Sequence, residues 1–192
     1  MRSINKGCKI ILITGGSGSG KSAFGEKMAC EIGGNEKKYY IATMQPFDKE
    51  CRKRIEQHRE MRKGRGFETI EQYRNIEEAG RLIEEKVQGT AGGGATVLVE
   101  CMSNLLANEM YTQSGEKTDW TKVCNKIMKG IEELLTVCEN IVIISNEVFS
   151  DGCGYDEDTL SYIEKLGEIN TRIARMAEQV YEVVCGLPMR KK

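Results

Sequence analysis

The chain has 192 residues, and its 28 basic and 29 acidic side chains leave a formal net charge of −1 with histidine neutral. This balance excludes a global positive field that would attract nucleic acid or a membrane surface. A hydrophobic content of 40% with 30% charged residues is typical of a soluble globular protein, and the length suits a single domain over residues 1–192.

Apolar β-branched runs alternate with helical patterns along the whole chain. In chain order we predict a strand at 9–14, a helix at 22–32, a strand at 38–43, a helix at 47–63, a short strand at 67–70, a helix at 75–87, a strand at 96–99, helices at 105–111 and 120–138, a strand at 140–145, a helix at 159–179, a last strand at 181–185 and a C-terminal tail. Polar or glycine-rich connections are expected at 90–95, 113–119 and 152–158. This alternation predicts an α/β protein with a mostly parallel sheet and helices on both faces.

The N-terminal apolar run and the cysteines bear on the cellular compartment. No segment approaches about 18 consecutive apolar residues, so we predict no membrane span. The run KIILIT continues into glycine and serine instead of a small-residue cleavage site, so we expect a cytoplasmic protein. The eight cysteines form no C-x-x-C pair, and the chain has one histidine. Reduced, mostly buried thiols are expected, without a zinc site or a disulfide framework.

The strongest motif is GGSGSGKS, which fits G-x-x-x-x-G-K-[ST] between a predicted buried strand and a predicted helix. It consists of Gly15, Gly16, Ser17, Gly18, Ser19, Gly20, Lys21 and Ser22. Glycines let backbone N–H groups point at phosphate oxygens, and the helix N-terminus adds partial positive charge. Lys21 can bridge the β- and γ-phosphates, and the Ser22 hydroxyl can ligate Mg²⁺. A flexible linker is the alternative interpretation of this glycine-serine run, but linkers are not flanked by a buried strand.

This motif predicts a P-loop NTPase fold of the RecA-like, three-layer type, which binds a nucleoside triphosphate with Mg²⁺. Such proteins need an acidic residue at the end of a neighbouring strand to organise the ion. The run TVLVE supplies Glu100. A simple strand-end carboxylate is the alternative for Glu100. The sequence lacks the guanine-reading N-K-x-D motif and a second domain of the kind that a motor needs, so a small-molecule kinase is the default expectation.

Six segments spread over most of the chain carry a resemblance to a known family. They are IILITGGSGSGKSAFGEKMA, YYIATMQPFDKECRKRIEQHR, FETIE, VLVECMSNLLANEM, VIISNEV and EINTRIARMAEQVYEVVCGLPMRKK. Together they resemble the bifunctional adenosylcobinamide kinase / adenosylcobinamide-phosphate guanylyltransferase family of cobalamin biosynthesis. The resemblance implies phosphorylation of adenosylcobinamide from ATP or GTP, followed by GMP transfer from GTP to that phosphate. It also implies a homo-oligomer, a trimer by analogy, whose partners are a corrinoid and nucleotides.

In the family, GMP is first transferred to a histidine, and the R-I-x-x-H-R motif places His58 in that role. The residues give an independent argument, because a nucleotidyl-histidine requires a neutral imidazole nitrogen as nucleophile. Neighbouring cations disfavour a protonated ring and stabilise the charge that develops on the α-phosphate. The alternative is a solvated basic helix face that contains an incidental histidine.

The resemblance extends to several further side chains. It implies nucleotide contacts for Thr43 and Met44 after the second strand, phosphate contacts for Arg59 and Arg62, and a place near the guanosine for Glu71. An ordinary surface glutamate is the alternative for Glu71. Asn146 and Glu147 follow a predicted strand, at the carboxyl edge where α/β ligand sites lie, and are expected near the substrate. A structural cap is the alternative for this pair.

The sequence departs from the family pattern in three places. The phosphate loop lacks the arginine of G-G-A-R-S-G-K-S, the residues around the asparagine-leucine-leucine core of MSNLLANEM match loosely, and FSDGCGYDED replaces a glycine-rich turn that contains proline. These differences leave open an altered substrate or a single surviving activity. The other hypotheses are a small-molecule kinase without nucleotidyl transfer and a nucleotide-binding sensor or scaffold without turnover.

Overall fold

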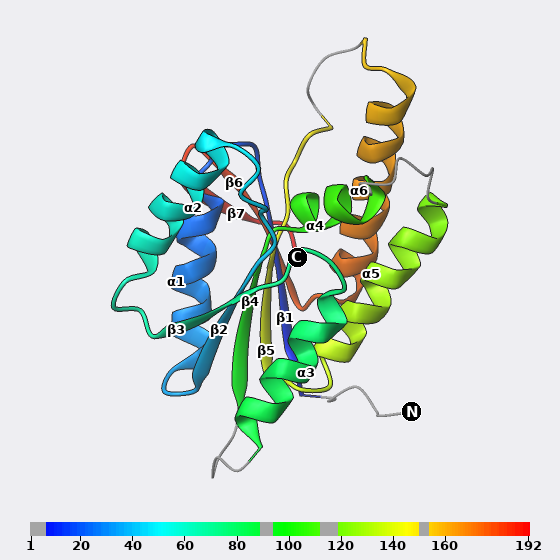
Figure 1. Ribbon diagram of the computed structural model, residues 1–192. Helices are drawn as coiled ribbons and strands as arrows, with labels where there is room; N and C mark the ends of the chain where they lie inside the picture. Colours follow the sequence, from blue (N-terminus) through cyan, green and yellow to red (C-terminus); the bar gives the residue numbers. More distant parts are fainter. Residues whose placement is uncertain (1–6, 89–93, 112–118, 150–153) are drawn as a thin grey trace.

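The computed structural model describes residues 7–88, 94–111, 119–149 and 154–192, and it has three layers (Figure 1). Of the connections predicted at 90–95, 113–119 and 152–158, residues 90–93, 113–118 and 152–153 lie outside the described residues, and the predicted loop at 152–158 overlaps the start of α6 at Glu157. In chain order the elements are β1 (Lys9–Thr14), α1 (Lys21–Gly33), β2 (Lys37–Ala42), α2 (Lys49–Arg62), β3 (Phe67–Glu71), α3 (Ile76–Val87), β4 (Ala95–Glu100), α4 (Met102–Met110), α5 (Trp120–Leu134), β5 (Asn140–Ile144), α6 (Glu157–Met176), β6 (Gln179–Val184) and β7 (Leu187–Arg190).

The described strands form one sheet in the order β3-β2-β4-β5-β1-β6-β7, parallel except for β7. The P-loop strand β1 lies between β5 and β6, so β5 separates it from β4. The sequence predicts Glu100 at the end of a strand next to β1. This prediction is wrong, because β5 lies between β1 and β4. It pairs in register with Ile144 of β5, which in turn neighbours Ile13 of β1. The carboxyl edge of the sheet still brings β1 and β4 to one site, since parallel strands end on the same side.

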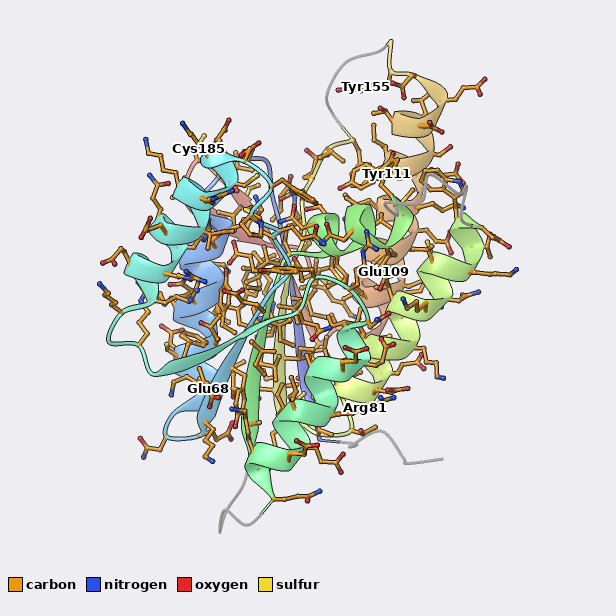
Figure 2. All side chains as sticks on the ribbon, in the orientation of Figure 1. Glu68, Arg81, Glu109, Tyr111, Tyr155 and Cys185 are labelled. Carbon is orange, nitrogen blue, oxygen red and sulfur yellow. The ribbon has the colours of Figure 1, made fainter. Side chains whose placement is uncertain are left out.

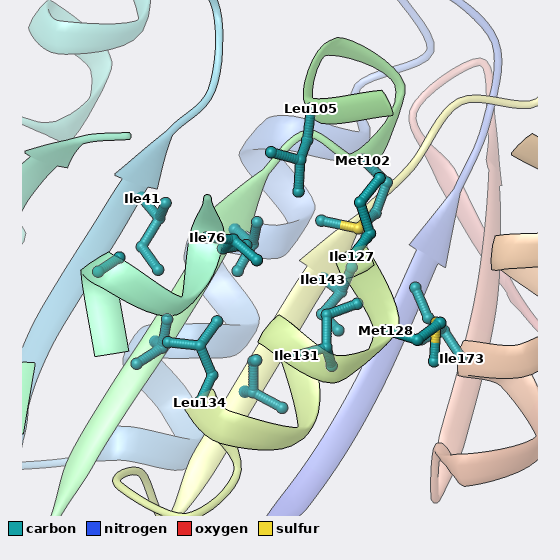
Figure 3. Packing of buried hydrophobic residues seen from close by; sticks show 14 of the residues in the cluster. Ile41, Ile76, Met102, Leu105, Ile127, Met128, Ile131, Leu134, Ile143 and Ile173 are labelled. Carbon is teal, nitrogen blue, oxygen red and sulfur yellow. The ribbon is translucent and has the colours of Figure 1, made fainter. Parts of the chain in front are cut away.

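The side chains of each central strand alternate between two cores, as expected for a sheet covered on both faces. On β1, Leu12 faces a large core with α3, α4, α5 and α6, and Ile13 faces a smaller core with α1. Figure 3 shows part of the larger core, to which Ile41 and Ile143 of the sheet and Leu134 of α5 all belong. Figure 1 shows α1 and α2 on one side of the sheet and α3, α4, α5 and α6 on the opposite side.

Several helix ends differ from the prediction for local reasons. Helix α2 begins at Lys49 because Asp48 caps it, accepting a hydrogen bond of 2.7 Å from Cys51 N. In α6 the Asp156 side chain accepts from Thr159 N at 2.7 Å, so this helix begins at Glu157. Helix α4 already begins at Met102, and α5 ends at Leu134 instead of extending to 138.

The segment predicted as a C-terminal tail is strand β7, paired antiparallel to β6. Two residues join the strands, Cys185 at φ 50° and Gly186 at φ 80°, which is the backbone of a two-residue hairpin turn with positive φ at both positions. Gly186 N donates a hydrogen bond of 2.8 Å to Ser19 O, so the hairpin supports the phosphate loop.

The described cysteines are less buried than the sequence predicts. Cys101, Cys124 and Cys138 are buried, three others are partly buried, and Cys185 is exposed at the surface (Figure 2), so "mostly buried" was wrong for the cysteines that the structure describes. Cys153 lies outside the described residues. Within the described ranges, every helix is too short or too polar to cross a bilayer.

Candidate active site

The phosphate loop curls between β1 and α1 in a conformation that glycine makes possible. A Cβ at Gly15 would lie 2.6 Å from Val183 O, and Gly20 has φ 91° at the start of α1. Neither position tolerates an ordinary side chain without displacing the backbone. Lys21 folds back over the loop, and its Nζ donates to Gly16 O at 3.0 Å. A hydrogen bond to the loop itself therefore holds the lysine over the loop backbone.

Glu100 is the centre of the polar contacts beside the loop. The Ser22 hydroxyl donates a hydrogen bond to Oε1 of Glu100, and the Tyr40 hydroxyl donates to Oε2 at 3.0 Å. Burial and the Glu100 charge raise the pKa of the Tyr40 phenol, so Tyr40 remains a donor. Serine hydroxyl and carboxylate oxygens are ligands that Mg²⁺ prefers, so Ser22 and Glu100 fit this ion.

Helix α2 brings His58 to Glu100. His58 Nδ1 lies 3.6 Å from Glu100 Oε1, and the exposed fractions of the two side chains are 24% and 11%. The structure thus brings His58, Ser22 and Glu100 together from three separate elements. His58 is therefore partly buried against Glu100, whereas most of its neighbours on the same helix are exposed.

The two arginines beside His58 have different surroundings. Arg59 forms an ion pair with Glu71, whose Oε2 also accepts a hydrogen bond of 2.8 Å from the Tyr73 hydroxyl. Burial and this hydrogen bond raise the pKa of Tyr73 to about 12. Arg62 is buried, and its guanidinium carbon stands 3.5 Å from the centre of the Tyr40 ring. Its Nη1 has no hydrogen-bond partner among the described residues, so it is available to an anion.

These groups line a cavity of about 890 Å³. Of the residues expected from the sequence, it is lined by Ser17, Gly18, Ser19, Gly20, Lys21, Ser22, Met44, His58, Arg59, Arg62, Glu71, Glu100 and Asn146. The described lining does not include Gly15, Gly16, Thr43 or Glu147. The volume suits a nucleotide-sized ligand, since small-molecule sites fall near 300–1,000 Å³.

Thr43 and Glu147 make contacts within the fold. The buried Thr43 hydroxyl donates to Cys101 O at 2.8 Å and accepts from Cys101 N at 2.7 Å. Glu147 Oε1 accepts a hydrogen bond of 2.9 Å from Phe149 N. Asn146 does line the cavity, although its Nδ2 donates to Ser103 Oγ at 2.9 Å. These contacts favour a structural contribution from Thr43 and Glu147.

Sequence reasoning missed Glu26, Tyr40 and Arg65. Glu26 lies one helical turn after Ser22, is fully buried, and has Arg65 Nη1 2.9 Å from its Oε2. Burial raises the pKa of the Glu26 carboxyl, although the positive charge of Arg65 opposes this effect. The i, i+4 spacing from Ser22 was a usable signal, because it places both residues on one helix face.

Comparisons with known proteins agree with this site. The profile of the family described as cobinamide kinase / cobinamide phosphate guanyltransferase matches residues 11–191. The chain belongs to this family. The expected family assignment is confirmed, and the protein is accordingly an enzyme of this kinase and guanyltransferase family.

Two relatives match nearly end to end. The bifunctional adenosylcobalamin biosynthesis protein CobU of Escherichia coli (strain K12) is 29% identical over 194 residues, which cover 95% of this chain and 99% of the relative. The bifunctional adenosylcobalamin biosynthesis protein CobP of Pseudomonas aeruginosa is 31% identical over 186 residues, covering 94% and 96%. The family similarity therefore includes the phosphate loop, the histidine helix and the C-terminal hairpin.

Solved structures confirm the P-loop NTPase fold alone. One solved ATPase domain superposes with a TM-score of 0.53 at 11% identity, covering 91% of this chain and 68% of that one. A KaiC-like protein from Pyrococcus horikoshii gives a TM-score of 0.52 at 13% identity, covering 91% and 71%. At such low identity these neighbours carry no information about substrate.

Proposed function

We propose that this protein phosphorylates adenosylcobinamide from ATP or GTP and then transfers GMP from GTP to that phosphate through a guanylyl-His58 intermediate. The observation that carries the proposal is the position of His58, which lies in the phosphate-loop cavity with Nδ1 facing Glu100. An incidental histidine on a basic helix would not be expected to lie beside the strand-end carboxylate of Glu100, which accepts a hydrogen bond from Ser22.

The orientation of the ring suggests which nitrogen attacks. If the ring hydrogen is on Nδ1, where it faces the Glu100 carboxylate 3.6 Å away, the lone pair of neutral His58 is on Nε2. Nε2 attacks the α-phosphorus of GTP, an N–P bond forms, and the bond to the oxygen bridging the α- and β-phosphates breaks. Pyrophosphate leaves with the electron pair of that bond. The imidazolium of the intermediate is stabilised by the adjacent carboxylate of Glu100.

The second half returns the histidine to its starting state. A terminal phosphate oxygen of adenosylcobinamide phosphate attacks the same phosphorus, the N–P bond breaks, and a phosphoanhydride forms in adenosylcobinamide-GDP. Arg62, buried and with an unpartnered Nη1, is suited to bind a phosphate oxygen in both steps. Arg59 is suited to the same task once the incoming phosphate competes with Glu71.

The kinase half rests on the phosphate loop. Lys21 would move from Gly16 O to the β- and γ-phosphates, and the loop N–H groups would bind their oxygens. Mg²⁺ held by Ser22 and Glu100 would neutralise charge on these phosphates. Lys21 and Arg62 then supply the remaining positive charge around the transferred group.

The test uses GTP labelled at the α-phosphate, without a corrinoid. The wild type is expected to acquire an acid-labile, alkali-stable label on one site per chain, whereas His58→Ala acquires none. Gln57→Ala is the matched control, because Gln57 precedes His58 on α2 and also lines the cavity. An unlabelled wild type that still binds GTP would contradict the transferase half of the proposal.

A parallel experiment with adenosylcobinamide and GTP labelled at the γ-phosphate separates the remaining hypothesis of a kinase without nucleotidyl transfer. That hypothesis expects label from the γ-phosphate in a phosphorylated corrinoid, and no labelled protein with GTP labelled at either phosphate. It also expects His58→Ala to lose affinity for nucleotide without losing a second chemical step.

We further propose that the protein is a homo-oligomer, a trimer by analogy with the family. Large apolar side chains such as Leu187 of β7 and Phe47 are 69% and 70% exposed in the single chain, which is compatible with a contact between copies. Light scattering coupled to size-exclusion chromatography measures the mass directly. A monomer at micromolar protein concentration would contradict this proposal.

A further inference from the structure

Glu26, His58 and Glu100 form a cluster from α1, α2 and the end of β4. One possible ligand atom of each residue lies within 4.8 Å of those of the other two. Two carboxylates and an imidazole are a mixed oxygen and nitrogen donor set, which differs from the oxygen-only set offered by Ser22 and Glu100. The guanylyl-transfer chemistry proposed above uses His58 and Glu100 and gives no task to Glu26.

The polar atoms of this cluster are incompletely satisfied. The Glu26 side chain is fully buried, and its Oε1 has no hydrogen-bond donor among the described residues. His58 Nδ1 is also buried without a hydrogen-bond partner in the described part of the chain. A buried carboxylate oxygen and a buried imidazole nitrogen without hydrogen-bond partners cost free energy, part of which a bound cation would recover.

Outer contacts orient both carboxylates toward the centre of the cluster. Arg65 Nη1 lies 2.9 Å from Glu26 Oε2 as an ion pair without hydrogen-bond alignment. The Tyr40 hydroxyl donates to Glu100 Oε2, which leaves Oε1 on the side of His58. Metal-binding carboxylates are characteristically held in this way by partners outside the ligand set.

We propose that Glu26, His58 and Glu100 form a binding site for a transition-metal dication of the Zn²⁺ class. The imidazole selects such an ion over Mg²⁺, which prefers oxygen ligands and octahedral geometry. Three protein ligands leave one position open, which is the arrangement of zinc sites that retain a water. Because Glu100 serves this site and the Mg²⁺ at the nucleotide phosphates, the two ions compete for it.

Binding of this ion would block transfer to His58. A neutral imidazole has one in-plane lone pair, and a metal on Nδ1 takes it. The remaining hydrogen then resides on Nε2, which cannot attack phosphorus. A Zn²⁺-class ion would therefore act as an inhibitor of the guanylyl-enzyme step, and release of the ion restores the reactive tautomer.

The test is a titration of the chelator-treated full-length protein with Co²⁺ alone, without nucleotide, followed by visible absorption. The wild type is expected to bind one Co²⁺ per chain, to release it to Zn²⁺ and to retain it in excess Mg²⁺. Glu26→Gln is expected to weaken binding at least about tenfold, the lower end of the loss when even an outer-shell partner of a metal is removed. Glu31→Gln is the matched control, because Glu31 is on the same helix and exposed, beside Lys27.

Three results would overturn the proposal. They are a wild type that binds no Co²⁺, a Glu26→Gln variant that binds like the wild type, and a spectrum with thiolate-to-cobalt charge-transfer bands, which would assign the ion to cysteines. Near-UV circular dichroism checks that Glu26→Gln is folded. His58→Ala is a second test variant that is less able to disturb folding, because the His58 side chain is partly exposed, and it is also expected to lose the ion.

Discussion

Thr43→Val is expected to destabilise the protein without weakening nucleotide binding. Valine has nearly the shape of threonine, so the substitution removes the hydroxyl and leaves the packing in place. That hydroxyl is fully buried and satisfies two backbone groups, Cys101 N at 2.7 Å and Cys101 O at 2.8 Å. After the substitution, Cys101 N remains buried without a partner, whereas Cys101 O still accepts a hydrogen bond of 3.1 Å from Leu105 N.

The magnitude follows from the contact that Cys101 N loses. A buried polar group left without a partner costs about 1–3 kcal/mol, so the free energy of unfolding should fall by about that amount. Thr43→Ser is the control, because it keeps the hydroxyl and loses one methyl group, for a cost of about 1 kcal/mol. The difference between the two variants isolates the contribution of the hydroxyl.

Equilibrium unfolding in guanidinium chloride measures both variants, and the KM for GTP is measured under conditions in which each variant is folded. The expected result is a large fall in the unfolding midpoint for Thr43→Val, a small fall for Thr43→Ser, and an unchanged KM in both. A Thr43→Val protein of wild-type stability with a raised KM would refute the reasoning, and it would place Thr43 among the nucleotide contacts.

Three further substitutions or treatments test separate parts of the structure. Tyr40→Phe removes the 3.0 Å hydrogen bond to Glu100, so half-maximal kinase activity should need about tenfold more Mg²⁺, and an unchanged Mg²⁺ titration would contradict this role. Gly130→Ala places a Cβ 2.4 Å from an isoleucine methyl of α3, so the free energy of unfolding should fall by about 1–3 kcal/mol in denaturant titrations, whereas wild-type stability would mean that the helices separate freely. The Cys8 and Cys138 sulfurs lie 3.7 Å apart, and hydrogen bonding with Cys138 lowers the pKa of the Cys8 thiol. Treatment with a small-molecule disulfide should therefore oxidise this pair to a disulfide, and mass spectrometry of the intact protein should show the loss of two hydrogens. Cys8→Ser should abolish this loss.

The sequence was most informative where local chemistry determines structure. The unbroken apolar strands and the glycine-lysine-serine motif predicted the parallel sheet and the phosphate loop, because both depend on short-range residue patterns. Glu100 was found for the same reason, as an acid that directly follows a buried strand. Its place in the sheet was not, because strand order depends on long-range packing, and β5 separates β4 from β1.

The missed features depend on tertiary contacts or on a weak local signal. Glu26 resembles any helix glutamate until the fold buries it beside Arg65. Strand β7 was predicted as a tail, because Cys185-Gly186 is not one of the usual residue pairs of a two-residue hairpin, although both residues adopt the positive φ of such a turn. The structural use of Thr43 could not be predicted, because its partner Cys101 is 58 residues away in the sequence.

A chase of the isolated guanylyl-enzyme tests the central claim most directly. Wild-type protein labelled from the α-phosphate of GTP is freed of nucleotide and mixed with adenosylcobinamide phosphate in a single turnover. The account predicts that the label leaves His58 and appears in adenosylcobinamide-GDP, one product per labelled chain, at least as fast as steady-state turnover. Label that remains on the protein while unlabelled GTP supports full product formation would contradict the covalent route.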